Sequence, residues 1–149
     1  MNPATVQSDF QIIGARISEL EVHNDFISLE VRNDIAPIID ISHSIHMGPI
    51  NDDIKLGIVE LFVKVAVNKE DAHFTMRLTI EGGFNAPSAM ENGMFEKMLE
   101  INGITALYSF ARSTVASITS QTFLLGSIML PMINVTQYSK KIASDSSNK

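Results

Sequence analysis

Two runs of alternating apolar and polar residues, joined by a short charged turn, constrain the fold of this chain most strongly. The first run places apolar side chains at every second position from Val59 to Val67, and the second from Phe74 to Ile80. Asn-Lys-Glu-Asp at residues 68–71 separates them. A period of two with a short polar connection is typical of a β-hairpin that buries one face. The sequence therefore predicts an antiparallel sheet at the centre of the fold.

Further strand signals precede this hairpin. Apolar residues alternate from Phe10 to Val22, but the alternation shifts by one position beside Gly14, which predicts a β-bulge. The isoleucine-rich residues 37–45 predict another strand, because β-branched side chains favour extended structure. Residues 26–31 are expected to form either a short strand or an ordered part of a long loop.

After residue 88 the spacing of apolar residues changes to three and four, which predicts helices. A short helix is expected near residues 95–99, interrupted around residues 102–103, followed by a helix over residues 104–118. A coil then leads to Asn134, a plausible N-cap for a last helix from Val135 to Ile142. The long helix carries small residues on its other faces, which would let another helix approach closely: Ala106, Ser109, Ser113, Ala116 and Ser117.

Composition places the chain among ordinary globular proteins. It has 149 residues, 45% of them hydrophobic, which suits one α+β domain over residues 1–143 with a disordered tail at residues 144–149. A net charge of −6 opposes a nucleic-acid partner. The absence of cysteine fits a reducing compartment, and residues 1–9 lack the apolar run of a secretory leader. We therefore expect a cytoplasmic protein without membrane insertion.

Residue patterns that would indicate catalysis are weak. His43 and His46 are three residues apart and would share a helical face as metal ligands, but their segment is expected to be a strand or loop without an obvious third ligand. The adjacent carboxylates at residues 52–53 and 70–71 read as solvated turns. We therefore expect no enzyme, no cofactor and no metal site.

Several stretches, in this order, resemble the SecB family of protein-export chaperones. The strongest is Leu-Tyr-Ser-Phe-Ala-Arg at residues 107–112, which runs through a helix into Thr-Phe at residues 122–123. Leu-Pro-Met-Ile-Asn at residues 130–134 is similar to the family's entry into its final helix. Glu-Gly-Gly-Phe at residues 81–84 and Phe-Gln-Ile at residues 10–12 match the end of the fourth strand and the start of the first.

The resemblance implies a four-stranded antiparallel sheet with a long helix and a short C-terminal helix packed on one face. It implies a homotetramer, a dimer of dimers packed through the long helices. It also implies an ATP-independent holdase that binds unfolded polypeptides in apolar surface grooves and serves protein export and transport. The client-binding residues carried over by position are Phe26, Ile27, Leu29, Tyr108, Val135 and Tyr138.

Docking to the SecA motor is the uncertain part of this resemblance. The possible docking positions are Glu19, Leu20 and Glu21, but His23 follows them, and Arg77 stands on the fourth strand, where acidic residues are usual. A SecB-like protein dedicated to one partner, such as an antitoxin, is therefore an alternative. A hotdog-type thioesterase is a further alternative, although its helix normally comes early and is wrapped by later strands.

Overall fold

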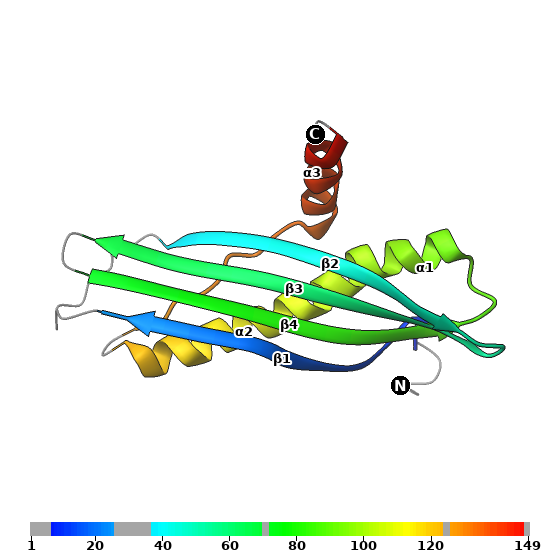
Figure 1. Ribbon diagram of the computed structural model, residues 1–149, viewed down its shortest axis with the longest axis horizontal. Coiled ribbons are helices and arrows are strands. Elements are labelled where there is room, and N and C mark those ends of the chain that lie inside the picture. The colour runs from blue at the N-terminus through cyan, green and yellow to red at the C-terminus, as the bar shows by residue number, and fades with distance from the viewer. Residues whose placement is uncertain (1–6, 26–36, 70–71, 124–125, 148–149) are drawn as a thin grey trace.

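The structure is a computed structural model that describes residues 7–25, 37–69, 72–123 and 126–147 (Figure 1). Four strands form one antiparallel sheet: β1 (Gln11–Asn24), β2 (Ile38–Ile50), β3 (Ile54–Lys69) and β4 (Ala72–Pro87). The strand order is β1-β4-β3-β2, so β2, β3 and β4 form a meander and the first strand pairs with the last. The predicted hairpin and fold class are confirmed. Residues 26–31, the possible short strand, lie outside the described residues.

The predicted bulge in the first strand is confirmed. The register between β1 and β4 shifts between Ile12 and Gly14, and it shifts again between Ile17 and Glu19. The second shift was not predicted. A bulge adds one residue and so changes which positions of the strand face the core. Because the first bulge lies between them, Ile12 and Ile17 point to the same face of the sheet although they are five residues apart; they are opposite Phe84 and Ile80 respectively.

The predicted interruption around residues 102–103 is a change of helix type, not a break between two helices. The helix runs without a break through α1 (Asn92–Met98), a single π-helical segment η2 (Leu99–Gly103) and α2 (Ile104–Thr122). Gly103 has ordinary helical angles, and a Cβ at this position would lie 3.1 Å from Val59 Cγ2. Glycine is therefore explained by close helix–sheet packing, and it does not end the helix.

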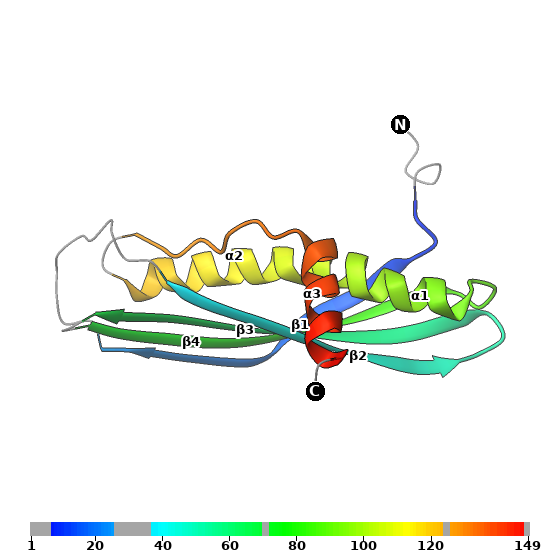
Figure 2. The ribbon, with the colours of Figure 1, turned by 90° about the horizontal axis from the view of Figure 1, so that it is seen from above.

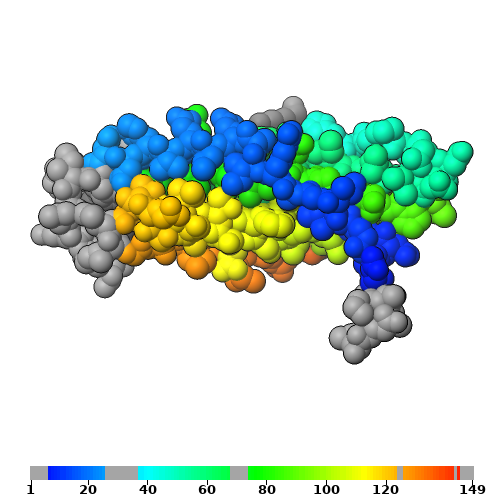
Figure 3. All heavy atoms as spheres, turned by 90° about the horizontal axis from the view of Figure 1, so that it is seen from below, coloured from blue at the N-terminus to red at the C-terminus, as the bar shows by residue number. Residues whose placement is uncertain are grey.

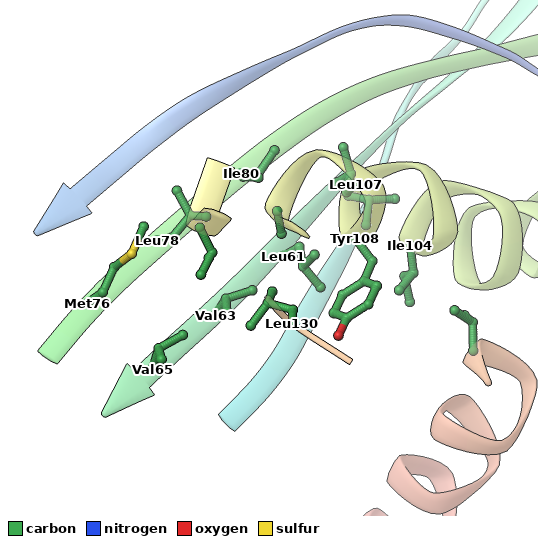
Figure 4. Close-up of a cluster of buried hydrophobic side chains, with 14 of the residues drawn as sticks. Leu61, Val63, Val65, Met76, Leu78, Ile80, Ile104, Leu107, Tyr108 and Leu130 are labelled. Atoms are coloured by element: carbon green, nitrogen blue, oxygen red, sulfur yellow. The ribbon is translucent and has the colours of Figure 1, made fainter. Parts of the chain in front are cut away.

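The core lies between the sheet and this helix. Figure 4 shows the strand side chains of Leu61, Val63 and Leu78 meeting Leu107 and Tyr108 of α2. Phe74, Phe84 and Phe95 are among the largest side chains that are fully buried. One face of the hairpin is thus closed by the helix, as the alternation predicts.

A coil returns along α2 and is held by side chains of that helix. The hydroxyl of Tyr108 donates to the carbonyl of Pro131 at 2.7 Å, and Arg112 Nε donates to the carbonyl of Leu130 at 3.0 Å. The backbone N–H of Ile128 donates to the buried Thr119 Oγ1 at 2.8 Å. These contacts satisfy polar groups that would otherwise be buried without partners.

The last helix, α3 (Val135–Ser147), begins where the sequence predicts. Asn134 Oδ1 accepts the backbone N–H of Gln137 at 3.1 Å, which confirms Asn134 as the N-cap. The helix extends past the predicted end at Ile142 and includes residues 144–147, which the sequence assigned to the tail. None of the helices in the described part of the chain is both long enough and apolar enough to cross a membrane.

The elements form two layers (Figure 2). α1, η2 and α2 lie along one face of the sheet, while α3 stands at the β2 edge and crosses the direction of the strands. None of the described helices covers the other face, which we call the open face; Glu60, Phe62 and Lys64 of β3 belong to it, because they alternate with the buried residues.

Candidate functional site

A row of apolar side chains on β1 stays exposed although it faces the helix layer. We call it the β1 stripe; it consists of Ile12, Ile17, Leu20 and Val22, which are 42%, 47%, 42% and 37% exposed. The helix layer packs on β3 and β4 and leaves β1 beyond its border. Figure 3 shows β1 and α2 side by side at this surface. The β1 stripe is therefore an apolar surface that the helix layer leaves uncovered.

The backbone of β1 from residue 11 to residue 22 has a described strand on one side only. β1 is the edge of the sheet, and among the described residues only β4 pairs with it. Phe110 on α2 adds to the apolar surface and is 51% exposed. It lies two residues from both Tyr108 and Arg112, so it points away from the coil that they hold. An extended chain can pair with the β1 backbone and bury apolar side chains against the stripe.

Two of the client-binding residues carried over by resemblance are inside the molecule. Tyr108 and Val135 are 4% and 8% exposed and belong to the hydrophobic core. Phe26, Ile27 and Leu29 lie outside the described residues. In this conformation Tyr108 and Val135 anchor the coil and α3 to the sheet.

Tyr138 fastens α3 to β2. Its hydroxyl lies 3.0 Å from His43 Nδ1, and the two rings are 5.5 Å apart. Burial raises the pKa of Tyr138 to about 12, so the hydroxyl keeps its proton. Burial lowers the pKa of His43, and the nearby carboxylate of Glu100 partly opposes this effect. His43 with an unprotonated Nδ1 accepts the hydroxyl proton of Tyr138, whereas a protonated Nδ1 donates to the hydroxyl oxygen, which can then donate to the carbonyl of Ile41 at 3.5 Å.

Stability should therefore depend on the protonation of His43. Because its pKa is lower in the folded chain than in the unfolded chain, the contribution is complete above the unfolded value of 6.5 and is lost as pH falls through the folded pKa. We expect the melting temperature to fall more between pH 7.5 and pH 5 than it does in His43→Gln, which does not titrate. Equal falls in the two proteins, measured by circular dichroism, would contradict this assignment.

His43 and His46, considered from the sequence and not favoured as metal ligands, lie on opposite faces of the sheet. His43 faces the helix layer beside Tyr138, while His46 lies on the open face, with Nε2 3.3 Å from Glu60 Oε2. The described residues contain no group of three or more side chains suited to hold a metal ion.

A cleft of about 470 Å³ separates α3 from α1 and η2. Most of its lining residues are polar, and they carry both signs of charge, including Glu96, Lys97, Glu100 and Lys140. This lining suits a polar ligand better than an apolar segment of an unfolded chain.

The possible motor-docking residues point to different faces. Glu19 and Glu21 lie on the open face, opposite Thr79 and Arg77, whereas Leu20 belongs to the β1 stripe. Arg77 Nη1 is 3.8 Å from Glu21 Oε2, so the acidic surface is partly neutralised. The small residues of α2 are partly or fully exposed: Ala106, Ser109, Ser113, Ala116 and Ser117. Ala106 also packs against the border of the core.

Structural comparison finds similar folds in solved proteins. The SecB-like chaperone Rv1957 of Mycobacterium tuberculosis, solved in complex with a ChAD peptide from the HigA1 antitoxin, matches with a TM-score of 0.63. The match covers 88% of this chain and 92% of that one, at 13% sequence identity. This chain has a SecB-like fold. A Streptococcus agalactiae protein of unknown function matches with a TM-score of 0.59, at 9% identity, over 83% of this chain and 97% of that one.

Sequence comparison adds no relative. No protein-family model matches this sequence. A search of curated proteins likewise finds no match. The assignment of the fold therefore rests on the three-dimensional arrangement of the elements.

Sequence reasoning missed the β1 stripe. The alternation at residues 10–22 predicted that one face of this strand is apolar, but not that the helices stop short of it. The exposed coil methionines Met129 and Met132, 59% and 79% exposed, are further apolar surface. In the sequence, this exposed apolar surface was indicated only by the high methionine content of the helical half.

Proposed function

We propose that this protein is an ATP-independent chaperone that holds unfolded or slowly folding polypeptides and has no catalytic activity. The observation that carries the proposal is the β1 stripe, an exposed apolar row along an edge strand that pairs with β4 and with no other described strand. The SecB-like fold supports it, because a protein with this fold has been solved with a bound peptide. α2 follows all four strands, so the wrapped helix of a hotdog-type thioesterase is not the arrangement here.

Binding would combine two weak and sequence-tolerant interactions. The outer backbone of β1 offers hydrogen bonds that any extended chain can make, except at proline. Ile17, Leu20 and Phe110 add apolar contacts without demanding one particular side chain. Several such surfaces in one assembly would raise the overall affinity through avidity. Tyr108, Val135 and Tyr138 would support this surface by fixing the coil and α3, and Phe26, Ile27 and Leu29 would extend it.

We further propose a cytoplasmic homotetramer, a dimer of dimers, assembled through the small-residue face of α2. Ser109, Ser113 and Ser117 are exposed on that face, and short side chains allow two helices to pack closely. The hydroxyl of Ser109 donates to the carbonyl of Thr105 in the same helix at 3.0 Å, which removes some of the cost of burying this hydroxyl.

A chaperone dedicated to one partner peptide, such as an antitoxin segment, is a second candidate. It is favoured by the peptide-bound structural neighbour and by the ion pair between Arg77 and Glu21, which weakens an acidic docking surface for SecA. The structure gives less support to a role in protein export, in which Glu19, Leu20 and Glu21 would dock to SecA.

The decisive experiment measures aggregation of an unrelated unfolded protein with and without this chain, in the absence of ATP. Light scattering on the same sample gives the mass of the assembly. A general chaperone keeps the client soluble and has the mass of about four subunits. If the client aggregates as in buffer alone while the chain stays folded, general chaperone activity is contradicted, and peptide arrays should then be searched for one tight ligand.

A further inference from the structure

The open face of the sheet carries its charges in two opposite rows. Residues directly opposite each other on neighbouring strands point to the same face, so the strand register defines rows that cross the sheet. The cationic row consists of Asp40, Lys64, Arg77 and Glu21. The central row consists of Ser42, Phe62, Thr79 and Glu19. The anionic row consists of Ser44, Glu60, Glu81 and Arg16.

Each charged row has two like charges at its middle. Lys64 is directly opposite Arg77, and Glu60 is directly opposite Glu81. Like charges in this position cost stability. Within one chain, neighbours on the outer strands offset part of this cost: Glu21 pairs with Arg77, Arg16 with Glu81 and His46 with Glu60. Within the part of the chain that the structure describes, no ion pair of Lys64 is found, which leaves its ammonium available to a partner.

In the anionic row, a hydrogen bond favours the charged form of Glu60. Ser44 Oγ donates to Glu60 Oε2 at 2.6 Å, and this hydrogen bond is the main reason why the pKa of Glu60 is lowered. Arg16 Nη2 lies 3.1 Å from Glu81 Oε2 at the β1 end of the row. The middle of this row therefore presents carboxylates to solvent at neutral pH.

The central row separates the two charged rows with a mainly uncharged surface. Phe62 is 37% exposed, and Thr79 beside it is 7% exposed. A shallow hollow of about 370 Å³ lies here, between Phe62, Lys64, Arg77 and Glu19. An aromatic side chain beside a hollow is a suitable centre for a contact with another protein surface.

We propose that the open face is a self-complementary docking surface for a second copy of this chain, related to the first by a twofold axis along the central row. Rotation about that axis places the cationic row of each copy over the anionic row of the other. Lys64 then meets Glu60 of the second copy, and Arg77 meets its Glu81. Phe62 meets Phe62. The contact is isologous, as most contacts in symmetric dimers are.

At the ends of the rows, the proposed arrangement gives one favourable charge contact, one neutral contact and one like-charge contact. Glu21 at the β1 end of the cationic row meets Arg16 of the second copy. Asp40 at the β2 end meets the neutral Ser44. Glu19 meets its own counterpart, a like-charge contact at the border of the interface, where solvent screens it.

The size of the surface predicts a weak contact. From Ile38 to His46 along the strands and from β1 to β2 across them, it covers roughly 400 Å² per copy. A stable interface usually buries about 800 Å² per partner. Charge pairs between the two copies would thus supply a large share of the binding free energy, so we expect added salt to weaken the association. This contact uses neither the small-residue face of α2 nor the β1 stripe, so it goes beyond the proposed chaperone function.

Sedimentation velocity with charge-reversed variants tests the proposal. At pH 7.5 we expect the wild-type mass to double when salt is lowered from about 500 mM to about 20 mM. Lys64→Glu alone and Glu60→Lys alone should each stay at the high-salt mass, because like charges then meet. Each substitution removes a like-charge pair between β3 and β4, and Lys64→Glu also places a carboxylate opposite Asp40 on β2. Circular dichroism of each variant checks that the fold is retained.

An equimolar mixture of the two variants is the sharpest part of this test. Lys64→Glu carries two carboxylates where Glu60→Lys carries two ammonium groups, so the mixed pair should regain the doubled mass at low salt. A mixture that associates no better than either variant alone overturns the proposal, as does association of Lys64→Glu that equals the wild type.

Cysteine cross-linking supplies a geometric test. Because the described chain has no cysteine, one introduced thiol reports one position. Phe62→Cys should form a disulfide-linked dimer under mild oxidation at low salt, since this residue meets itself on the axis. Gln137→Cys on α3, also exposed, is the control and should stay unlinked. Equal cross-linking of both variants, or of neither, contradicts the proposed axis.

Discussion

Replacing Phe84 by alanine should lower the free energy of unfolding by about 3–5 kcal/mol, the cost of truncating a buried aromatic side chain. Phe84 is 1% exposed and stacks on Phe10 with ring centroids 5.2 Å apart and planes 10° from parallel. It also lies beneath Gly103, whose imagined Cβ would be 3.5 Å from its ring. The Phe84 ring, on β4, therefore contacts both Phe10, which immediately precedes β1, and the junction of η2 and α2. We expect that no single neighbouring side chain can fill the cavity that its removal would leave.

Urea unfolding at a fixed protomer concentration would measure this loss, because oligomers change their apparent stability with concentration. Phe110→Ala is the matched control: the same substitution at a side chain that is 51% exposed should change the free energy of unfolding by less than about 0.5 kcal/mol. A loss below about 1 kcal/mol for Phe84→Ala would show that the aromatic cluster does not connect these elements.

The second large effect should appear in client binding. We expect the double substitution Ile17→Ser with Leu20→Ser to weaken binding of an unfolded polypeptide about tenfold. Each side chain is nearly half exposed and has roughly 1 kcal/mol of apolar burial left to gain from a client. A loss of 1.4 kcal/mol in binding free energy corresponds to a factor of ten.

Fluorescence anisotropy with a labelled unfolded chain would measure the affinity, and light scattering would give the mass of each variant. Ile13→Ser is the control, since Ile13 lies on the same strand, is 61% exposed, and packs beside Gly83 on the open face. If the double variant binds as the wild type does, the β1 stripe is not the client surface. If its mass falls instead, the stripe is an interface between copies of the chain.

Much of the fold could be predicted from local sequence. The alternation at residues 59–67 and 74–80 predicted the central hairpin and the face it buries. The shifted alternation beside Gly14 predicted the bulge, and Asn134 predicted the start of α3. Each of these features depends on neighbours a few residues apart, through side-chain direction in a strand or a hydrogen bond at a helix end.

The candidate site could be predicted only in part. The sequence indicated that β1 has an apolar face, and it indicated exposed small residues on the long helix. It did not indicate that Tyr108 and Val135 are buried, because an apolar residue in a helix pattern reads the same in a core and in a groove. His43 and His46 are three residues apart, so they lie on opposite faces of the sheet if their segment is a strand. The sequence left strand and loop both open for this segment, so it did not predict this separation.

The sequence by itself determined which segments become strands or helices, and which side of each is apolar. Only the tertiary structure decided that β1 pairs with β4, beyond the border of the helix layer, and that Gly103 serves close packing. It also decided the register that aligns Lys64 with Arg77 and Glu60 with Glu81. These features join residues that are distant in the chain. They depend on which arrangement of the whole chain buries enough apolar surface to offset the entropy lost when the loops close.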